Sequence, residues 1–118
     1  MTIKIEEYLQ EGGHSPYRGW FDRLNAAYAA KVSVGVLRLS QGNTSSVKWF
    51  DGLGELRIDW GPGMRVYLVQ DGDTLIVLFG GGTKATQRKD IAKARELLVE
   101  YKSRKRALRA AVGKKQKR

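Results

Sequence analysis

The stretch that decides the fold is ELRIDWGPGMRVY, residues 55–67. Its first part alternates apolar residues (Leu56, Ile58 and Trp60) with charged ones, as a strand does when it buries one face. The Gly-Pro-Gly at 61–63 predicts a tight turn, because proline fixes one φ and glycine permits a positive φ. The alternation resumes after the turn, so we predict two antiparallel strands paired as a hairpin.

Further strands are expected on either side of this hairpin. Residues 46–50 can form a short strand before it. The Asp-Gly at 71–72 is a strong hairpin signal, and the nearly continuous apolar run at 74–79 suits the centre of a sheet. We expect the three glycines at 80–82 to end that strand. A weaker alternation at 2–9 predicts a first strand at the N-terminus.

Two helices are expected between the first strand and the others. Ser15 followed by proline is typical of a helix start, which predicts a short helix over about 16–24. Asn25 can cap a second helix that runs to about residue 40, where the next glycine permits a left-handed exit.

A long final helix is expected to begin after Thr83 or Thr86 and to end at Gly113. The complete order is then β-α-α-β-β-β-β-α, which belongs to the α+β class. The length predicts one domain over residues 1–101, followed by a basic helix end and tail over 102–118.

Composition excludes several classes of protein. The chain has 118 residues and no cysteine, which rules out disulfides, thiol catalysis and thiolate metal sites. No window approaches the ~18 consecutive apolar residues of a membrane span. The first seven residues include two acids and no apolar signal core, so we expect a cytoplasmic protein that makes no membrane contact. No cofactor is expected.

The positive charge is concentrated at the C-terminus. The chain has 22 Lys and Arg against 12 Asp and Glu, giving a net charge of +10. Nine of the basic residues and none of the acidic ones lie in 102–118, so the rest of the chain is nearly neutral. Such a tail predicts a polyanionic partner such as RNA. The alternative is a solvated segment that only favours solubility.

Several kinds of catalytic site are excluded or disfavoured by the residues present. His14 is the sole histidine, so a histidine acid–base pair and a multi-histidine metal site are impossible, and we expect it in an exposed loop. No metal site is predicted. The run GGGTK at 80–84 lacks the spacing of a nucleotide-binding P-loop, although its backbone could still meet a single phosphate.

Three cations on neighbouring β elements form the main candidate site. Arg57 and Arg65 are out of phase with the apolar residues of their strands, so a hairpin would place both guanidiniums on one face. Lys84 follows the neighbouring strand at its exit. Together they predict a phosphate-binding surface. In the alternative interpretation, these are surface charges paired with Glu55 and Asp59.

Three segments together resemble the RelE/ParE toxin superfamily: residues 55–67, LFGGGTKATQ at 78–87 and DIAKA at 90–94. The resemblance is closest to the branch called addiction module killer proteins, which includes HigB-like toxins and related phage proteins. It covers about residues 1–101 and is strongest over 53–98. It implies a compact fold in which a curved antiparallel sheet packs against two N-terminal helices and one C-terminal helix.

The resemblance implies the toxin of a type II toxin–antitoxin pair. Such a toxin is neutralised by a small antitoxin, usually a helix-turn-helix protein, and operator DNA is bound only through their complex. Many members are ribosome-dependent endoribonucleases that cut mRNA, which makes the ribosome and mRNA the expected partners. Two alternatives stay open: a ParE-like protein that inhibits DNA gyrase without catalysis, and a plain RNA- or ribosome-binding module.

The resemblance also implies roles for individual residues. Arg57, Arg65 and Lys84 match basic positions of the family and are expected to be catalytic, with Arg65 gripping the phosphorane. The aromatic or histidine acid–base residue of some members has no clear counterpart, because Tyr101 lies on the apolar stripe of its helix and is expected in the core. Tyr67 shares the strand phase of Arg65, so it could stack on an RNA base or lend a hydroxyl. The other side chains expected to bind RNA are Lys48, Arg88, Lys89, Arg104, Lys105 and Arg106.

Overall fold

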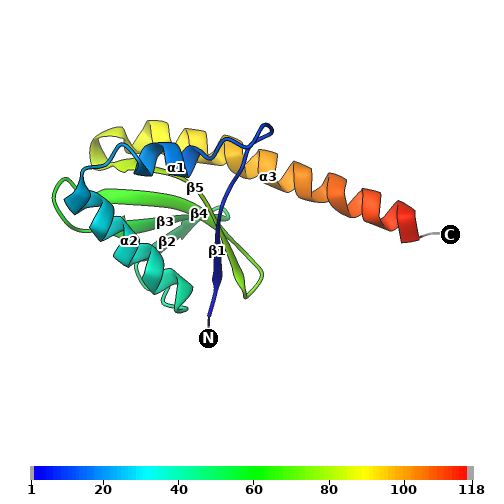
Figure 1. Cartoon of the computed structure of the whole chain (residues 1–118), viewed down its shortest axis with the longest axis horizontal. Coiled ribbons are helices and arrows are strands. Elements are labelled where there is room, and N and C mark those ends of the chain that lie inside the picture. The colour runs from blue at the N-terminus through cyan, green and yellow to red at the C-terminus, as the bar shows by residue number, and fades with distance from the viewer. Residues whose placement is uncertain (1, 117–118) are drawn as a thin grey trace.

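The computed structural model describes residues 2–116 and has the α+β organisation that the sequence predicts (Figure 1). The elements occur in the predicted order. They are β1 (Lys4–Glu7), α1 (Pro16–Phe21), α2 (Ala26–Ser40), β2 (Val47–Phe50), β3 (Leu53–Ile58), β4 (Met64–Asp71), β5 (Leu75–Thr83), a 3-10 turn (Lys84–Thr86) and α3 (Gln87–Gln116). None of the helices in this described part of the chain is long and apolar enough to span a membrane.

The strands form one mixed sheet in the order β1-β5-β4-β3-β2. Strands β2 to β5 are an antiparallel meander, and β3 pairs with β4 as the predicted hairpin. The expectation of a wholly antiparallel sheet is wrong, because β1 runs parallel to β5, with Lys4 opposite Leu75. The two helices α1 and α2 separate β1 from the meander, so no tight turn forces an antiparallel direction.

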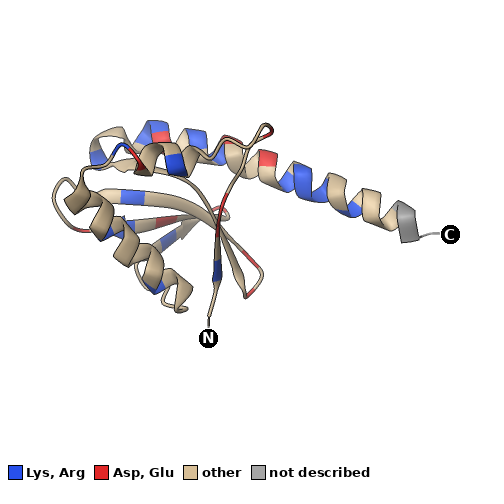
Figure 2. Ribbon diagram, viewed as in Figure 1, with Lys and Arg blue, Asp and Glu red and all other residues tan. Residues whose placement is uncertain are grey.

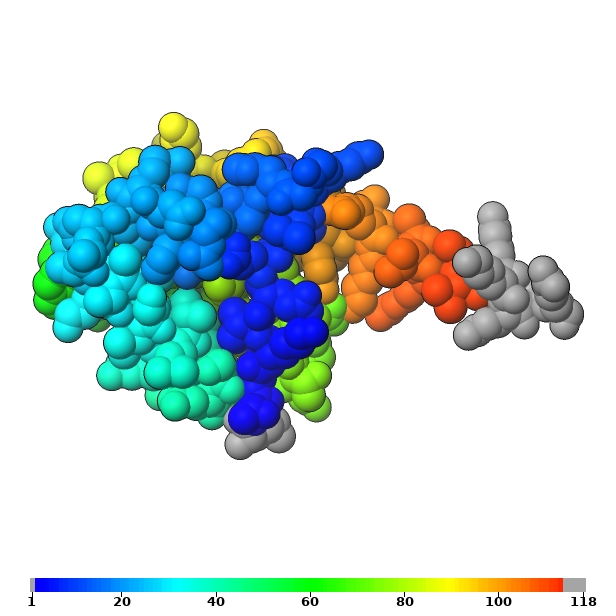
Figure 3. All heavy atoms as spheres, viewed as in Figure 1, coloured from blue at the N-terminus to red at the C-terminus, as the bar shows by residue number. Residues whose placement is uncertain are grey.

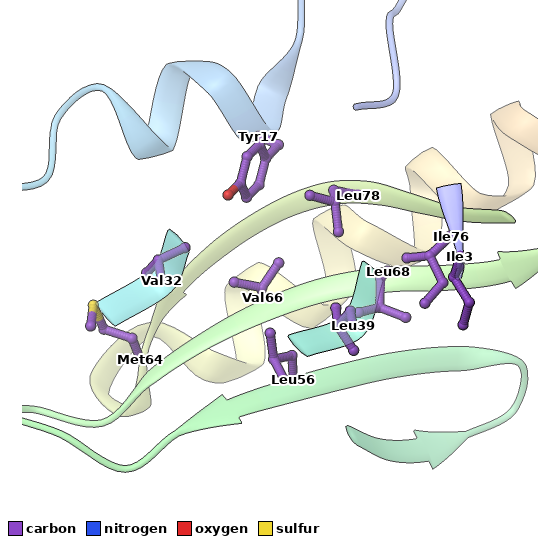
Figure 4. Close-up of a cluster of buried hydrophobic side chains, with 10 residues drawn as sticks. All are labelled: Ile3, Tyr17, Val32, Leu39, Leu56, Met64, Val66, Leu68, Ile76 and Leu78. Carbon is purple, nitrogen blue, oxygen red and sulfur yellow. The ribbon is translucent and has the colours of Figure 1, made fainter. Parts of the chain in front are cut away.

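Helices α1 and α2 cover one face of the sheet and begin where their caps predict. The Ser15 hydroxyl accepts a hydrogen bond from the Arg18 backbone N–H at 3.0 Å, and the Asn25 side chain accepts one from the Tyr28 N–H at 3.0 Å. Figure 4 shows the core beneath them, in which side chains of both helices meet those of the strands. Its buried members are Ile3, Tyr17, Val32, Leu39, Leu56, Met64, Val66, Leu68, Ile76 and Leu78.

The first half of α3 covers the opposite face of the sheet. Alternate residues of β3, β4 and β5 point to this side and pack against the helix, as the strand period requires. Tyr101 belongs here as expected, with its ring edge-on to Tyr8 and Phe79. The buried members are Tyr8, Leu53, Tyr67, Val69, Val77, Phe79, Ala94, Leu97 and Leu98.

The glycine run at 80–82 does not end β5, contrary to the prediction. The strand continues to Thr83 because the glycines allow close packing on both faces. A Cβ on Gly81 would lie 2.5 Å from the Trp20 ring of α1, and one on Gly82 would lie 1.8 Å from the Asp90 carboxylate of α3. Each distance is far below van der Waals contact, so only glycine fits without movement of these neighbours.

The second half of α3 projects beyond the body of the molecule (Figure 3). The helix continues through Gly113 to Gln116, so the prediction that this glycine ends the helix is wrong. The predicted boundary between the domain and its basic tail, at residue 101, falls inside this continuous helix. Where the projection leaves the sheet, Lys105 pairs with Asp71, and Arg104 Nη1 donates to the Leu9 carbonyl at 2.6 Å.

Candidate active site

The pairing of β3 with β4 brings two of the predicted cations together. Arg57 lies directly opposite Arg65 in the register, so their side chains leave the same face of the sheet. This is the face covered by α3, since both residues alternate with Leu56 and Val66, which belong to the core beneath α1 and α2. The sequence pattern predicted this common face correctly.

A buried carboxylate lies between the two arginines. Glu55 has only 1% of its surface exposed. Its Oε1 accepts from Arg57 Nε at 3.0 Å and lies 3.7 Å from Arg65 Nε, while its Oε2 accepts from Gln87 Nε2 at 2.9 Å. The alternative interpretation as ion pairs is therefore correct for Glu55. Asp59, the second carboxylate in that interpretation, makes no ion pair within the described part of the chain.

The surroundings keep Glu55 ionised. Burial by itself would raise the pKa of this carboxyl. The hydrogen bonds from Gln87 and Arg57, together with the positive charges of Arg57 and Arg65, outweigh burial and hold the pKa of Glu55 below its usual value. The site thus contains a fixed negative charge that orients two guanidiniums. Sequence reasoning named Glu55 only as an ion-pair partner and missed Gln87, which no local pattern links to this strand.

The two arginines differ in their access to solvent. The side chain of Arg57 is 41% exposed, whereas that of Arg65 is only 12% exposed. Arg65 also turns inward, with its Nη1 donating to the Gly63 carbonyl at 3.3 Å. Arg57 is therefore the guanidinium that an external phosphate reaches most directly, and the expected role of Arg65 as the main phosphate clamp conflicts with its burial.

Lys84 lies next to this pair. Its backbone N–H donates to the Gly63 carbonyl at 3.1 Å, so Lys84 and the Arg65 guanidinium share one acceptor in the turn between β3 and β4. Lys84 is exposed. The three predicted catalytic cations thus belong to one corner of the molecule, where the β3–β4 turn meets the exit of β5.

The prediction that Tyr67 stacks on an RNA base is wrong. Tyr67 lies on the same face as Arg65 but is 1% exposed, because the first half of α3 covers its ring. Burial, and secondarily the negative charge of Glu55, raises the pKa of this phenol well above its usual value. Tyr67 therefore stays protonated and presents no surface to a ligand.

The other predicted RNA-binding residues fall into two separate groups. Lys48 lies opposite Glu55 on β2 and is exposed, so it borders the arginine pair, and the exposed Arg88 and Lys89 follow Gln87 in the first turn of α3. The second group lies on the distal half of α3, about 25 Å along the helix from its start. Its members are Arg104, Lys105 and Arg106.

The three residues of this distal group differ in whether the protein itself already binds them. Lys105 is held by Asp71, and Arg104 bonds the Leu9 carbonyl, while Arg106 is exposed. Figure 2 shows that basic residues continue along the projecting part of α3 beyond its last acidic residue. This surface is cationic but separate from the arginine pair.

His14 is exposed beside Gly19 of α1, as expected for a loop residue. No group of three or more His, Asp or Glu side chains that could hold a metal ion occurs within the part of the chain that the structure describes.

No family model matches the chain. An uncharacterized protein of Haemophilus influenzae (strain Rd) is 40% identical over 102 residues, which covers 85% of this chain and 97% of the relative. The chain belongs to the same family as this protein. Because only about 15% of the chain lies outside this match, the match to the relative includes the strands that carry the arginine pair.

Proposed function

We propose that the chain has a RelE/ParE-like fold and is the toxin of a type II toxin–antitoxin pair that cleaves mRNA on the ribosome. The observation that carries this proposal is the Arg57–Arg65 pair, which the buried carboxylate of Glu55 orients beside the exposed Lys84. The sequence resemblance over residues 55–94 supports the same assignment. The order of helices and strands is compatible with it.

The proposed reaction is attack of a ribose 2′-hydroxyl on the adjacent phosphorus. The new bond joins the 2′-oxygen to phosphorus while the bond to the 5′-oxygen breaks, which leaves a 2′,3′-cyclic phosphate. The attacking hydroxyl loses its proton and the leaving 5′-oxygen gains one. Negative charge grows on the phosphorane oxygens, and fixed guanidinium and ammonium groups stabilise it without further reorganisation.

The residues divide this work according to their exposure. Arg57 faces solvent and binds the phosphorane oxygens, while Lys84 adds a second charge from the β5 exit. Arg65 supports the site from beneath through Gly63. The single histidine lies beside α1, so histidine acid–base catalysis does not assist the reaction at this site. The ribosome makes up for this by holding the mRNA in the in-line geometry.

A protein partner is also proposed, namely a cognate antitoxin of the helix-turn-helix type, through whose complex operator DNA is bound. The support is apolar surface on the projecting half of α3. Leu108 is 69% exposed and Val112 is 49% exposed on this helix, and Leu9, after β1, is 52% exposed. Leu9 and Leu108 line a groove of about 480 Å³ between α3 and β1, and an exposed apolar groove of this kind favours a protein partner.

The proposal is tested by expressing single variants and mapping cuts in cellular mRNA by primer extension. Arg57→Ala and Lys84→Ala are each expected to lower cleavage and growth arrest by about 100-fold or more, because each removes a charge from the phosphorane. Lys4→Ala removes an exposed cation from β1, away from the arginine pair, and is the control. Intact messages accompanied by DNA damage would instead indicate gyrase inhibition.

The projecting helix favours a second candidate, an RNA- or ribosome-binding module without catalysis. Lys102, Arg106 and Arg109 have no carboxylate within ion-pair distance among the side chains that the structure describes, so they are available to a polyanion. Removal of residues 102–118 separates the candidates. A binding module loses its function, whereas the nuclease keeps mRNA cleavage.

A further inference from the structure

We propose that the β2 edge of the sheet carries a track for single-stranded RNA, which extends from α2 past Arg57 to β2. This edge track consists of two adjoining cavities, and most of its residues have no role in the site described above. The inference rests on the proposed function for the identity of the ligand as RNA. It does not depend on which residue performs the cleavage.

The first cavity lies between α2 and the end of β3. Its volume is about 380 Å³, which is within the usual size range of small-ligand pockets. Gly35 brings α2 close to the strand, since a Cβ there would lie 3.3 Å from the Leu56 side chain. The polar and aromatic members of its wall are Lys31, Arg38, Asn43, Ser46, Arg57, Asp59 and Trp60.

The second cavity adjoins the first at the sheet edge. Its volume is about 290 Å³, and it shares Ser46, Arg57 and Asp59 with the first cavity. Lys48 of β2 also belongs to its wall. Because β2 begins at Val47, opposite Leu56, whereas β3 continues to Ile58, the last residues of β3 have no strand beside them on the β2 side, and the two cavities lie at this step in the sheet edge.

The track is cationic along its length. Lys31, Arg38 and Lys48 have no carboxylate within ion-pair distance among the described side chains, and Arg57 shares Glu55 with Arg65. Asp59 is the only acid in either wall. Four cations against one carboxylate, spread over two adjoining cavities, match a chain of phosphates better than a single anion.

One aromatic ring stands at the mouth of the first cavity. Trp60 is 37% exposed, and Tyr28 holds it edge-on with the two ring centroids 5.2 Å apart. The Lys31 ammonium lies 5.4 Å from the centre of the indole. An indole with a cation over one face can stack on a base through its other face while the cation binds the neighbouring phosphate.

These features favour single-stranded RNA over an acidic peptide. An acidic peptide would use the indole only where it carries an aromatic or proline residue, whereas every base has a face that can stack on it. A duplex would keep its bases away from Trp60, so the strand must be single. Arg57 lies in the wall of both cavities and beside Glu55, so a strand in the track passes the proposed cleavage site.

The test measures binding of a fluorescently labelled 2′-O-methyl RNA of about ten nucleotides, within the usual site size of single-strand binders. This probe has no free 2′-hydroxyl, so it reports binding without cleavage. Trp60→Leu is expected to raise Kd at least about five-fold through lost stacking. The double variant Lys31→Gln/Arg38→Gln is expected to lower the slope of log K against log salt by about 1.4, because two phosphate contacts are lost.

The controls remove the same groups elsewhere. Trp49→Leu removes an exposed indole from β2 outside the cavities, and Lys4→Gln/Lys93→Gln removes two exposed cations from β1 and α3. Thermal melting verifies that each variant is folded. Equal weakening by the controls, or unchanged binding by the track variants, would overturn the inference even if mRNA is cleaved. Weakening confined to the track variants in a protein that cuts no mRNA would support the track and refute the nuclease.

Discussion

Replacing Glu55 by glutamine tests the account of the arginine pair. The substitution keeps the shape of the side chain but removes the buried charge between Arg57 and Arg65. Removing one partner of a buried ion pair costs about 3–5 kcal/mol. Because Arg57 is partly exposed and can be hydrated, and the amide keeps one acceptor, we expect Glu55→Gln to lower the free energy of unfolding by about 2–3 kcal/mol at neutral pH.

The free energy of unfolding is measured by urea unfolding. Thermal unfolding gives a second measure, and the melting temperature is expected to fall by about 10 °C for a chain of this size. The effect also has a defined pH dependence. Because the pKa of Glu55 is lower in the folded protein than its usual 4.5, its contribution to stability is present above that value. The contribution is lost as the pH falls through the folded-state pKa, so the difference between wild type and Glu55→Gln should shrink in acid.

The matched control is Glu96→Gln on α3, whose side chain is 74% exposed and only 3.9 Å from Lys93. This substitution is expected to change stability by less than about 0.5 kcal/mol. If Glu55→Gln behaved like Glu96→Gln at neutral pH, or if its deficit were the same at all pH values, the carboxylate would not be holding the arginines.

Two further predictions concern the packing of the sheet. Gly81→Ala is expected to destabilise the protein by about 1–3 kcal/mol, because its Cβ meets the Trp20 ring, whereas Gly80→Ala, which has no atom within 4 Å, should be nearly neutral in the same urea experiment. Tyr101→Phe removes the hydrogen bond to Asp71 and is expected to cost about 1–2 kcal/mol at neutral pH. Burial, then the Asp71 bond, raises the pKa of Tyr101 to about 12, so wild-type stability should fall above about pH 10, where the unfolded phenol ionises first. Tyr101→Phe should show a smaller fall between about pH 10 and about pH 12, and an equal fall would contradict this assignment.

The parts of the fold that were predictable are those set by local chemistry. The caps at Ser15 and Asn25 and the hairpin turn at 61–63 depend on a few adjacent residues, and each was identified from the sequence. The glycine run at 80–82 was misinterpreted because its cause is not local. Glycine usually marks a strand end, but here it makes room for Trp20 and Asp90, which come from two different helices.

The same distinction applies to the candidate site. Period-two alternation placed Arg57 and Arg65 on one face, and this required only the strand assignment. It could not show how α3 covers that face, which buries Tyr67, leaves Arg57 exposed and brings Gln87 to Glu55. The edge track was missed for a similar reason, because Lys31 and Trp60 meet only when α2 packs against the end of β3.

The arrangement of charge at the arginine pair itself favours a binding role. Like charges directly opposite on neighbouring strands repel, so Arg57 and Arg65 need a carboxylate on the same face. Burying that carboxylate costs free energy that its partners only offset, and apolar residues in the same places would stabilise a sheet at least as well. Stability alone therefore does not account for the cluster. One negative charge between two positive ones leaves a net positive charge, and it is presented through Arg57, the member that faces solvent. A fixed, half-exposed guanidinium of this kind is suited to an external anion, and phosphate is the anion that its two-pronged geometry fits best.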